Sequence, residues 1–440
     1  MAKAKSKKIT LEEALVPVEE QPYKVPKNWC WIHLLDSFDN VTDSKKKLAT
    51  KEYLEDGEYP IIDQGQDFIG GYTDDADMIY DGELPIVIFG DHTRCIKYID
   101  FQFAQGADGV KVLKPKQFWN DKAFYYAMQS IEIPNMGYRR HYPLFKDFCI
   151  PLPPLAEQKR IVEQIESLFS KLDEAKEKIE CLLDSKKVSC NSVLNKAFTG
   201  KLTAKWRENN NIKFETWEYI NFEKIIVEGP QNGMYKPKTS YGSGTKILRI
   251  DCFYDGKLEP WEKLKRLEIT DEEKHTYLLS VNDIVVNRVN SMPYLGKSAL
   301  IRKLPEQCVF ESNMMRIKIN IRKANPEYVI RYLNSSIGLQ ELRKNAKQAV
   351  NQASINQQDV KMVKIALPSL EEQNEIVKII TSISNKDEAI LNKAEAVIEE
   401  IDLMKKSILA KAFRGELGTN ISKEKNSIEV LKKLIEEESK

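Results

Sequence analysis

Two long stretches of the chain repeat their apolar residues at steps of four and three, a pattern that predicts helices paired along a narrow coiled-coil seam. The seam positions of the first stretch are Ile161, Ile165, Leu168, Leu172 and Ile179. Those of the second are Ile376, Ile380, Ile383, Ile390, Val397 and Ile401. Each helix has roughly 40 residues and is therefore ~60 Å long. Because the two seams share one register, we favour paired helices over two unrelated surface helices.

The two helices belong to an internal repeat with a constant offset of 215 residues. Residues 150–202 align without a gap on residues 365–417, with 20 identities in 53 positions. A weaker similarity, at an offset of 188, relates the segment that begins at Trp29 to the one that begins at Trp217. The chain is therefore predicted to be a duplicated unit, in which a globular segment is followed by a helix.

Two charged residues interrupt the seams: Lys186 in the first helix and Asp387 in the second. If the helices pair antiparallel and roughly centred, these residues fall in adjacent layers. We predict that they contact each other and fix the register, a role that polar seam residues can have. The alternative, that these positions face solvent or another subunit, stays open at this point.

Helix boundaries are also visible in the sequence. Ser369 and Glu372 have the spacing of a capping box, which predicts the start of the second helix. Gly200 and Gly415 stand where a left-handed C-terminal cap is expected. Short helices are predicted at the start of the chain, from Thr10, and near its end, at 428–437.

The segments outside the helices contain strand-sized apolar runs separated by turn residues, with helices expected near 120–130 and 327–347. The predicted fold class is α+β: two mixed α/β heads joined by two long antiparallel coiled-coil helices, with pseudo-two-fold duplication. The predicted segments are a tail with a short helix at 1–24, a first head at 25–150, a helix and linker at 151–212, a second head at 213–365, a helix at 366–417, and a tail at 418–440.

Composition narrows the class of protein. The chain has 440 residues, of which 42% are hydrophobic and 30% charged, and no apolar run approaches the ~18–20 residues that a bilayer requires. We therefore expect no membrane span and a cytoplasmic location. The seven cysteines are scattered without a CxxC pair and the four histidines lie far apart. This pattern predicts free thiols and argues against a bound metal.

Sequence fragments that resemble catalytic motifs do not form an active site. Gly296-Lys297-Ser298 has the end of a phosphate-binding loop but lacks its first glycine, because Ser291 stands there. The tetrapeptide that begins at Asn325 resembles the Asn-Pro-Pro-aromatic motif of adenine methyltransferases, but its third residue is Glu327, and a helix N-terminus explains it better. We therefore predict a chain that is not an enzyme.

The repeated motifs carry a family resemblance. Each helix starts with Leu-Pro-x-Leu-x-Glu-Gln and ends with Ala-Phe-x-Gly-x-Leu, and Trp206-Arg207 follows the first end. This arrangement resembles the specificity (S) subunits of type I restriction-modification systems. Residues 86–94 with 106–109 are similar to one class of target recognition domain, and residues 283–297 to another. The two heads would then be target recognition domains 1 and 2.

The resemblance implies a non-catalytic, DNA-binding subunit of a host-defence and DNA methylation complex. Its partners would be double-stranded DNA with a bipartite target, two methyltransferase (M) subunits along the helices and two restriction/translocase (R) subunits. S-adenosylmethionine, ATP and Mg²⁺ would bind those partners and not this chain. The target bases, the spacer length and the presence of a restriction subunit cannot be predicted from the sequence. Two alternatives are a methyltransferase fused to its own recognition domain and a coiled-coil scaffold that binds proteins.

Charge gives unequal support for DNA binding. The formal net charge is −6 for residues 25–150 and +7 for residues 213–365. Only the second head has the basic surplus expected of a surface that follows phosphates. For the first head, either its basic residues gather on one face, or the methyltransferase partners supply much of the phosphate contact; we expect both.

Readout of base edges requires polar side chains that project from loops. In the first head the candidates are His92, Arg94, Arg139 and Arg140. In the second head they are Arg288, Asn290, Lys297, Asn313, Asn351 and Gln352, with Lys236 and Lys238 as phosphate contacts. Asp91 is expected either to accept from a cytosine amino group or to hold Arg94. Gly90, Gly106 and Gly109 are interpreted as turn residues.

Overall fold

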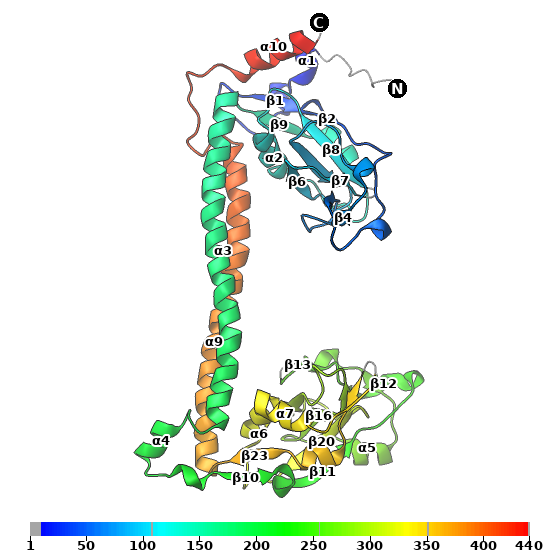
Figure 1. The fold of residues 1–440 in the computed structure, drawn as a ribbon, viewed down its shortest axis with the longest axis vertical. Coiled ribbons are helices and arrows are strands. Elements are labelled where there is room, and N and C mark those ends of the chain that lie inside the picture. Colours follow the sequence, from blue (N-terminus) through cyan, green and yellow to red (C-terminus); the bar gives the residue numbers. More distant parts are fainter. Residues whose placement is uncertain (1–9, 107–108, 255, 350–351, 439–440) are drawn as a thin grey trace. The chain divides into compact units, whose positions relative to one another are not determined.

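In the computed structural model, which describes residues 10–106, 109–254, 256–349 and 352–438, the chain forms two units. The first comprises residues 1–179 and 396–440, and the second residues 180–395. The long helices α3 (Leu155–Phe198) and α9 (Leu370–Ala412) contribute residues to both units (Figure 1). The bounds of the six segments expected from the sequence stay a prediction, because these units follow packing and each includes part of both long helices.

The first head is built on a four-stranded antiparallel sheet with the strand order β2-β8-β5-β6. A smaller sheet, β4-β3-β7, contains one parallel pairing, between β3 and β7, and β1 pairs antiparallel with β9. The bounds are β1 Cys30–His33, β2 Phe38–Asn40, β3 Tyr59–Ile62, β4 Gly71–Thr73, β5 Ile86–Gly90, β6 Ile96–Ile99, β7 Ala104–Gln105, β8 Val110–Pro115 and β9 Cys149–Leu152, with helices α1 Leu11–Ala14, α2 Asp121–Gln129 and α10 Ser427–Glu438 in the same unit.

The second head repeats the three sheets of the first head and adds two small ones. Its four-stranded antiparallel sheet has the order β11-β20-β16-β18, its smaller sheet β15-β12-β19 has a parallel pairing between β12 and β19, and β10 pairs with β23. The bounds are β10 Glu218–Asn221, β11 Ile226–Asn232, β12 Tyr241–Leu248, β13 Phe253–Tyr254, β14 Lys257–Leu258, β15 Arg266–Leu267, β16 Ile284–Asn287, β17 Val289–Asn290, β18 Ser298–Leu300, β19 Cys308–Phe310, β20 Met314–Ile319, β21 Lys347–Gln348, β22 Ala353–Ser354 and β23 Lys364–Leu367; the helices are α4 Ala204–Asn209, α5 Asp271–Tyr277, α6 Pro326–Asn334, α7 Ser336–Arg343 and α8 Gln357–Lys361. The duplication therefore extends over the heads, beyond the segments in which the sequence repeat is visible.

The repeated glutamine joins each long helix to its head. The Gln158 amide donates to the backbone oxygen of Pro153 at 2.9 Å and accepts from Asn120 N, at the start of α2, at 2.6 Å. In the second unit Gln373 donates to Pro368 O at 2.8 Å and accepts from Asn325 N, at the start of α6, at 2.8 Å. One glutamine in each repeat thus satisfies backbone groups at a helix start that would otherwise be buried without partners.

The repeated glutamate forms a second buried contact. We call Trp29, Glu157, Thr419 and Asn420 the first anchor, and Trp217, Glu372, Thr203 and Arg207 the second anchor. The indole N–H of Trp29 donates to Glu157 at 2.7 Å, and that of Trp217 donates to Glu372 at 2.9 Å. The weak tryptophan similarity in the sequence is therefore part of the same duplication. Both glutamates are fully buried.

The remaining partners of the two glutamates differ. Glu157 accepts from Thr419 Oγ1 at 3.2 Å and from Asn420 Nδ2 at 2.8 Å. Glu372 accepts from Thr203 Oγ1 at 2.6 Å and forms an ion pair with Arg207. The expected capping box at Ser369 is therefore only half correct. Ser369 Oγ accepts from Glu372 N at 3.3 Å, but the Glu372 carboxylate binds Arg207 instead of the backbone N–H of Ser369.

The seam residues pack as expected near the heads and less completely elsewhere. Ile161, Ile165, Ile376, Ile380 and Ile401 are buried. Leu168, Leu172, Ile179, Ile383 and Ile390 are half-buried, and Val397 is 41% exposed. A pair of helices covers its seam from one direction only, which leaves the flanks of the seam in solvent.

Ion pairs along α3 and α9 establish their antiparallel pairing. In the first unit Lys176 lies 3.5 Å from Asp402, and Asp173 pairs with Lys405. In the second unit Lys186 Nζ lies 2.7 Å from Asp387 Oδ1. The contact between Lys186 and Asp387 that was predicted from the seam pattern is confirmed; its role in fixing the register stays a prediction.

Two other helix predictions have different outcomes. Gly200 and Gly415 have φ values of +76° and +74°, so the left-handed caps are confirmed. The single helix predicted at 327–347 is wrong, because α6 and α7 are separate. Ser335 between them has extended backbone and its Oγ accepts from Gly338 N at 3.1 Å, which starts a new helix. Among the described residues no helix has the length and apolar character needed to cross a membrane.

Candidate DNA interface

In each head, three strands of the four-stranded sheet begin or end at the same end of that sheet. In the first head Gly90 at the end of β5 pairs with Val110 at the start of β8, and Phe89 pairs with Ile96 at the start of β6. We call residues 90–96 and 109–110 the first sheet end. In the second head Asn287 pairs with Met314 and Val286 with Ser298; residues 287–298 and 312–314 form the second sheet end. Most predicted DNA-contacting residues lie at or beside these two places.

At the first sheet end, His92 contacts a loop, and the sequence did not predict this contact. The His92 ring stacks on the ring of Tyr138, with centroids 4.8 Å apart and an angle of 12° between the planes. Tyr138 is 87% exposed, and Arg139 and Arg140 next to it are exposed as well. The structure therefore brings together three of the four predicted readers of the first head and adds an aromatic residue.

A buried histidine holds this loop against the sheet. The Asp91 carboxylate accepts from the backbone N–H of His141 at 2.8 Å and from that of Tyr142 at 2.7 Å. His141 Nδ1 lies 2.8 Å from Asp91 O, and Met136 N donates to His141 Nε2 at 3.1 Å, so the ring proton is on Nδ1. Asp91 is 2% exposed. Both expectations for Asp91, a cytosine contact and a contact with Arg94, are therefore wrong, because its buried carboxylate accepts hydrogen bonds from backbone N–H groups.

Arg94 differs from the other candidates of the first head. Its backbone has φ of +62°, and its Nη1 donates to Ile133 O at 3.0 Å. The side chain lines a hollow of about 870 Å³ that Phe169 of α3 and Lys405 of α9 also line, and that neither Arg139 nor Arg140 lines. Arg94 thus has an internal partner, and its role in base readout stays a prediction.

Of the three glycines interpreted as turn residues, Gly109 has the backbone of one, whereas Gly90 is the last residue of strand β5. Gly109 has φ of +95° and lies against the side chain of Gln64, where a Cβ atom would collide with the amide. The same Gln64 amide accepts from His92 N at 3.1 Å. Close approach of the backbone to Gln64 therefore explains Gly109 without a DNA contact.

The predicted readers of the second head also gather at one place. Arg288 N donates to Asn313 O at 2.8 Å, and Lys297 O accepts from Asn287 N at 2.9 Å. Asn290 in β17 pairs with Ala353 of β22, next to Gln352, which is exposed. Asn351 lies outside the described residues.

The side chains at the second sheet end are more constrained than those of the first. Arg288 Nη1 donates to Ser312 O at 3.1 Å, and Asn290 Oδ1 accepts from Ser291 N at 2.8 Å. The Lys297 ammonium lies over the ring of Tyr294, 5.0 Å from its centroid. These contacts orient the three side chains at the second sheet end.

The two predicted phosphate contacts are not equivalent. Both follow β11, whose last residue, Asn232, pairs with Met315 of β20 and so lies near the second sheet end. Lys236 Nζ lies 2.7 Å from Glu273 in α5, and this hydrogen bond lowers the pKa of the Glu273 carboxyl below its ordinary value. Lys238 is exposed. Only Lys238 is therefore presented to solvent as the prediction required.

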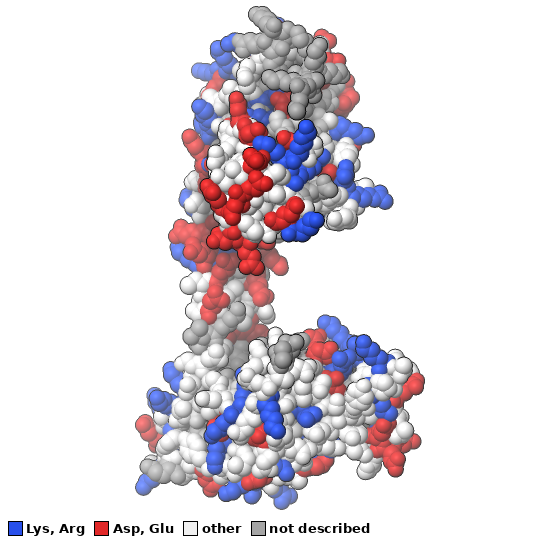
Figure 2. Space-filling model, turned by 45° about the vertical axis from the view of Figure 1, so that its right-hand side comes forward, with Lys and Arg blue, Asp and Glu red and all other residues white. Residues whose placement is uncertain are grey.

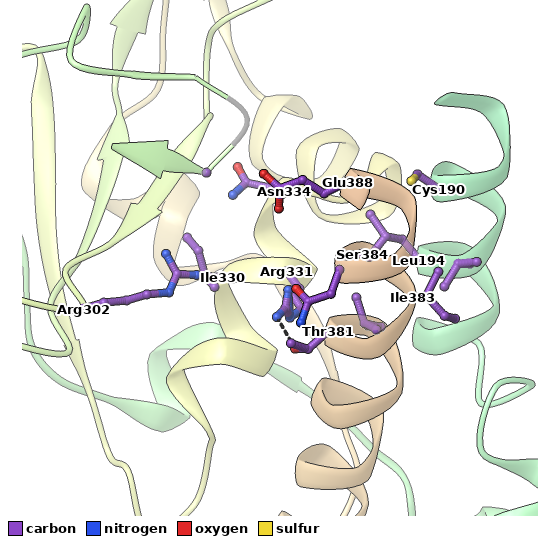
Figure 3. Close-up of a pocket in the computed structure, with 14 residues that line it drawn as sticks. Cys190, Leu194, Arg302, Ile330, Arg331, Asn334, Thr381, Ile383, Ser384 and Glu388 are labelled. Carbon is purple, nitrogen blue, oxygen red and sulfur yellow. Dashed lines mark hydrogen bonds between the residues drawn. The ribbon is translucent and has the colours of Figure 1, made fainter. Parts of the chain in front are cut away.

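A hollow of about 400 Å³ in the second unit lies between α6 and the paired helices (Figure 3). Arg331 Nη2 donates to Thr381 Oγ1 at 2.7 Å across it, and burial lowers the pKa of this guanidinium. Cys190 lines the same hollow, and burial raises the pKa of its thiol. This shift is away from the thiolate that a nucleophilic cysteine requires.

The two catalytic look-alikes have structural explanations. Ser298 begins strand β18, whereas a phosphate-binding loop leads into a helix. Asn325 is the N-cap of α6, and its side chain accepts from Glu327 N at 2.8 Å. Among the described residues no group of three His, Cys, Asp or Glu side chains could hold a metal ion.

The surface charges of the two heads differ as their net charges do. Figure 2 shows acidic side chains gathered over one face of the first unit, whereas basic side chains interrupt a mostly uncharged face of the second. The exposed Arg139 and Arg140 are therefore basic residues in an acidic head.

Two heads with the same three sheets on an antiparallel helix pair, and unlike polar loops at corresponding sheet ends, define a class of duplicated two-headed protein. The family described as type I restriction modification DNA specificity domain matches this chain over residues 26–182 and again over residues 231–400, and the chain belongs to this family.

Individual relatives agree with this assignment. The chain is similar to the type I restriction enzyme EcoKI specificity subunit of Escherichia coli (strain K12), at 31% identity over 61% of this chain and 57% of the relative. It is also similar to the StySPI specificity subunit of Salmonella potsdam, at 29% identity over 61% and 57%. The chain thus matches just under three fifths of the length of these two relatives.

A solved structure shares the fold. A chain from work on complex assembly and conformational transition of the type I R-M system has a TM-score of 0.62 and 18% identity, covering 90% of this chain and 100% of the other. The predicted architecture, two mixed heads with a long helix pair, is confirmed by this likeness and by the duplicated strand order.

Proposed function

We propose that this chain is the DNA sequence-recognition subunit of a type I restriction-modification complex and carries out no chemistry itself. The observation that carries the proposal is the pair of heads with one strand order but different side chains at corresponding sheet ends. A common scaffold with unlike polar loops suits the recognition of two unlike base sequences. The names of the relatives, which are specificity subunits, support the same function.

The partners we propose follow from that function. Double-stranded DNA with two short recognised sequences would contact the heads, and two methyltransferase subunits would bind along α3 and α9. Two restriction/translocase subunits would join through them, and S-adenosylmethionine, ATP and Mg²⁺ would bind these partners. The complex would act in the cytoplasm, where the DNA is.

The acidic first head gives this proposal a further feature. Its net charge of −6 opposes DNA phosphates, whereas the second head carries +7. We propose that the methyltransferase partners supply much of the phosphate contact around the first sequence. The isolated chain should therefore bind DNA weakly, with little preference for its own site.

Methylation mapping tests the proposed function. The chain is expressed with its methyltransferase, and the methylated DNA is sequenced. We expect two short sequences separated by a fixed interval, and exchange of residues 25–150 for those of a relative should change one sequence and leave the other. A methylation pattern that is unchanged by the exchange would instead support a protein-binding scaffold.

Two further experiments test the remaining parts. Lengthening α3 and α9 by matched heptads, which preserve the seam, should lengthen the interval between the two recognised sequences; an unchanged interval would show that the helices do not set it. Ultraviolet crosslinking of labelled S-adenosylmethionine to the purified chain would support the alternative of a fused methyltransferase.

A further inference from the structure

Tyr138 is unusual among the described aromatic residues of the first unit because it is 87% exposed and yet ordered by a ring contact. One face of its ring is covered by His92 in a nearly parallel stack. A single exposed aromatic residue is ordinary on a protein surface, so what distinguishes Tyr138 is the stack that orients its ring at the first sheet end.

The loop that carries Tyr138 is held at its base. Three hydrogen bonds connect it to Asp91 of the first sheet end, whose carboxylate accepts from His141 N and Tyr142 N and whose backbone oxygen accepts from His141 Nδ1. Inside the loop, His141 Nε2 accepts from Met136 N. A ring that is ordered before binding loses little conformational entropy when it meets its partner. This arrangement suits a contact that requires a defined position, such as one that discriminates between bases.

The neighbours of Tyr138 indicate the kind of partner. Arg139 and Arg140 follow it and are exposed, and His92 backs it. Two guanidinium groups beside a free aromatic surface match a polyanion that also presents flat apolar groups. DNA offers phosphates for the arginines and, in its grooves, base edges and the thymine methyl group for the ring.

We propose that Tyr138, supported by His92, contacts bases of the sequence recognised by the first head and sets part of its preference. This inference rests on the proposed function and assigns a recognition residue that the sequence did not indicate. Tyr138 acts through its ring, and Arg139 and Arg140 hold the adjacent phosphates or base edges.

The test uses the complex of the chain with its methyltransferase and DNA libraries in which each of the two recognised sequences is randomised in turn. Tyr138→Ala should lower the discrimination at one or two base pairs of one sequence by roughly ten-fold and leave the other sequence unchanged. Tyr138→Phe keeps the ring and should keep the preference. Because Tyr138 is exposed, neither variant should disturb folding.

Tyr219→Ala is the matched control, since Tyr219 is 63% exposed on β10, which pairs with β23 and not with a strand of the four-stranded sheet. It should leave both preferences unchanged. The inference is overturned if Tyr138→Ala has the wild-type profile, if both sequences lose discrimination equally, or if the variant fails only to assemble with the methyltransferase. If the wild-type complex recognises no bipartite sequence, the proposed function itself fails, which distinguishes the two.

Discussion

The two units place different chemistry at corresponding positions of the same helix pair. The repeat offset of 215 residues relates Leu172 to Asp387 and Ile401 to Lys186. In the first unit both positions are apolar, and Ile401 is 3% exposed. In the second unit they form an ion pair whose side chains are 28% and 10% exposed. In the first unit the helices therefore pair without a charged residue at this layer. The ion pair of the second unit is thus not a general requirement for pairing of the two helices.

The anchors show the same kind of difference. Each contains a tryptophan that donates to a buried glutamate, but Glu157 has otherwise neutral partners, whereas Glu372 is paired with Arg207. Arg207 is 7% exposed and also donates to Gly200 O at 2.6 Å. The shared contacts maintain the fold in both units, and the contacts that differ make the second unit more dependent on charge.

The largest expected effect separates the two anchors. Glu372→Gln leaves Arg207 buried without its counter-charge, which typically costs about 3–5 kcal/mol. Glu157→Gln changes a carboxylate with neutral donors and should cost about 1–2 kcal/mol. Urea unfolding of the two variants measures both changes in the free energy of unfolding.

Arg207→Met combined with Glu372→Gln is the control, because it removes the unpaired charge and should recover part of the lost stability. Equal losses in the two single variants would show that the ion pair does not distinguish the anchors.

The next effect concerns the seam layer. Asp387→Leu alone leaves Lys186 partly buried beside an apolar residue and should cost about 1–3 kcal/mol, whereas Asp387→Leu with Lys186→Ile reproduces the chemistry of the first unit and should restore stability. Thermal unfolding measures both. A double variant that is no more stable than the single one would mean that the two positions are not interchangeable between units.

Exchange of the two charges tests the predicted role in register. Lys186→Asp and Asp387→Lys should each destabilise the pair by like-charge contact, and the double exchange should restore it. If the double variant is not rescued, the ion pair does not fix the register of the helices.

The parts of the fold that depend on local pattern could be predicted from the sequence. The seam period is a local sequence pattern, and it predicted the two long helices and the contact between Lys186 and Asp387. The caps at Gly200 and Gly415 were predicted from the glycines at the helix ends. The break at Ser335 was missed because its neighbours continue a helical pattern. The shared strand order of the heads was also missed, since short strands leave a weak signal once their sequences diverge.

The candidate site was less predictable for a related reason. His92, Arg139 and Arg140 were found by residue type, but the Tyr138 stack joins residues 46 positions apart, and no periodicity reports such a contact. Asp91 was misjudged because a polar residue in a loop can bind the backbone as readily as a ligand. One sequence signal pointed to the loop that carries Tyr138 and His141: a histidine directly after two arginines.

The smallest expected effect contrasts basic residues in the segments beside the two sheet ends. Arg139 and Arg140 are exposed, whereas Lys236 is paired with Glu273. Glu273→Gln should release Lys236 for phosphate, so that the complex binds its DNA a few-fold more tightly and the slope of log K against log salt steepens by about 0.9. The amide can still accept from Thr270 N, which keeps the start of α5 capped.

Glu272→Gln is the control, because it removes the same charge from the neighbouring position of the same helix turn without altering the 2.7 Å contact between Lys236 and Glu273. Both variants change the long-range field equally, so only a local release of Lys236 can separate their salt slopes. Titrations of the complex with its DNA at several salt concentrations measure this difference. Identical slopes would mean that Lys236 stays away from the phosphates even when it is free, and Lys238 would then be the better candidate for that contact.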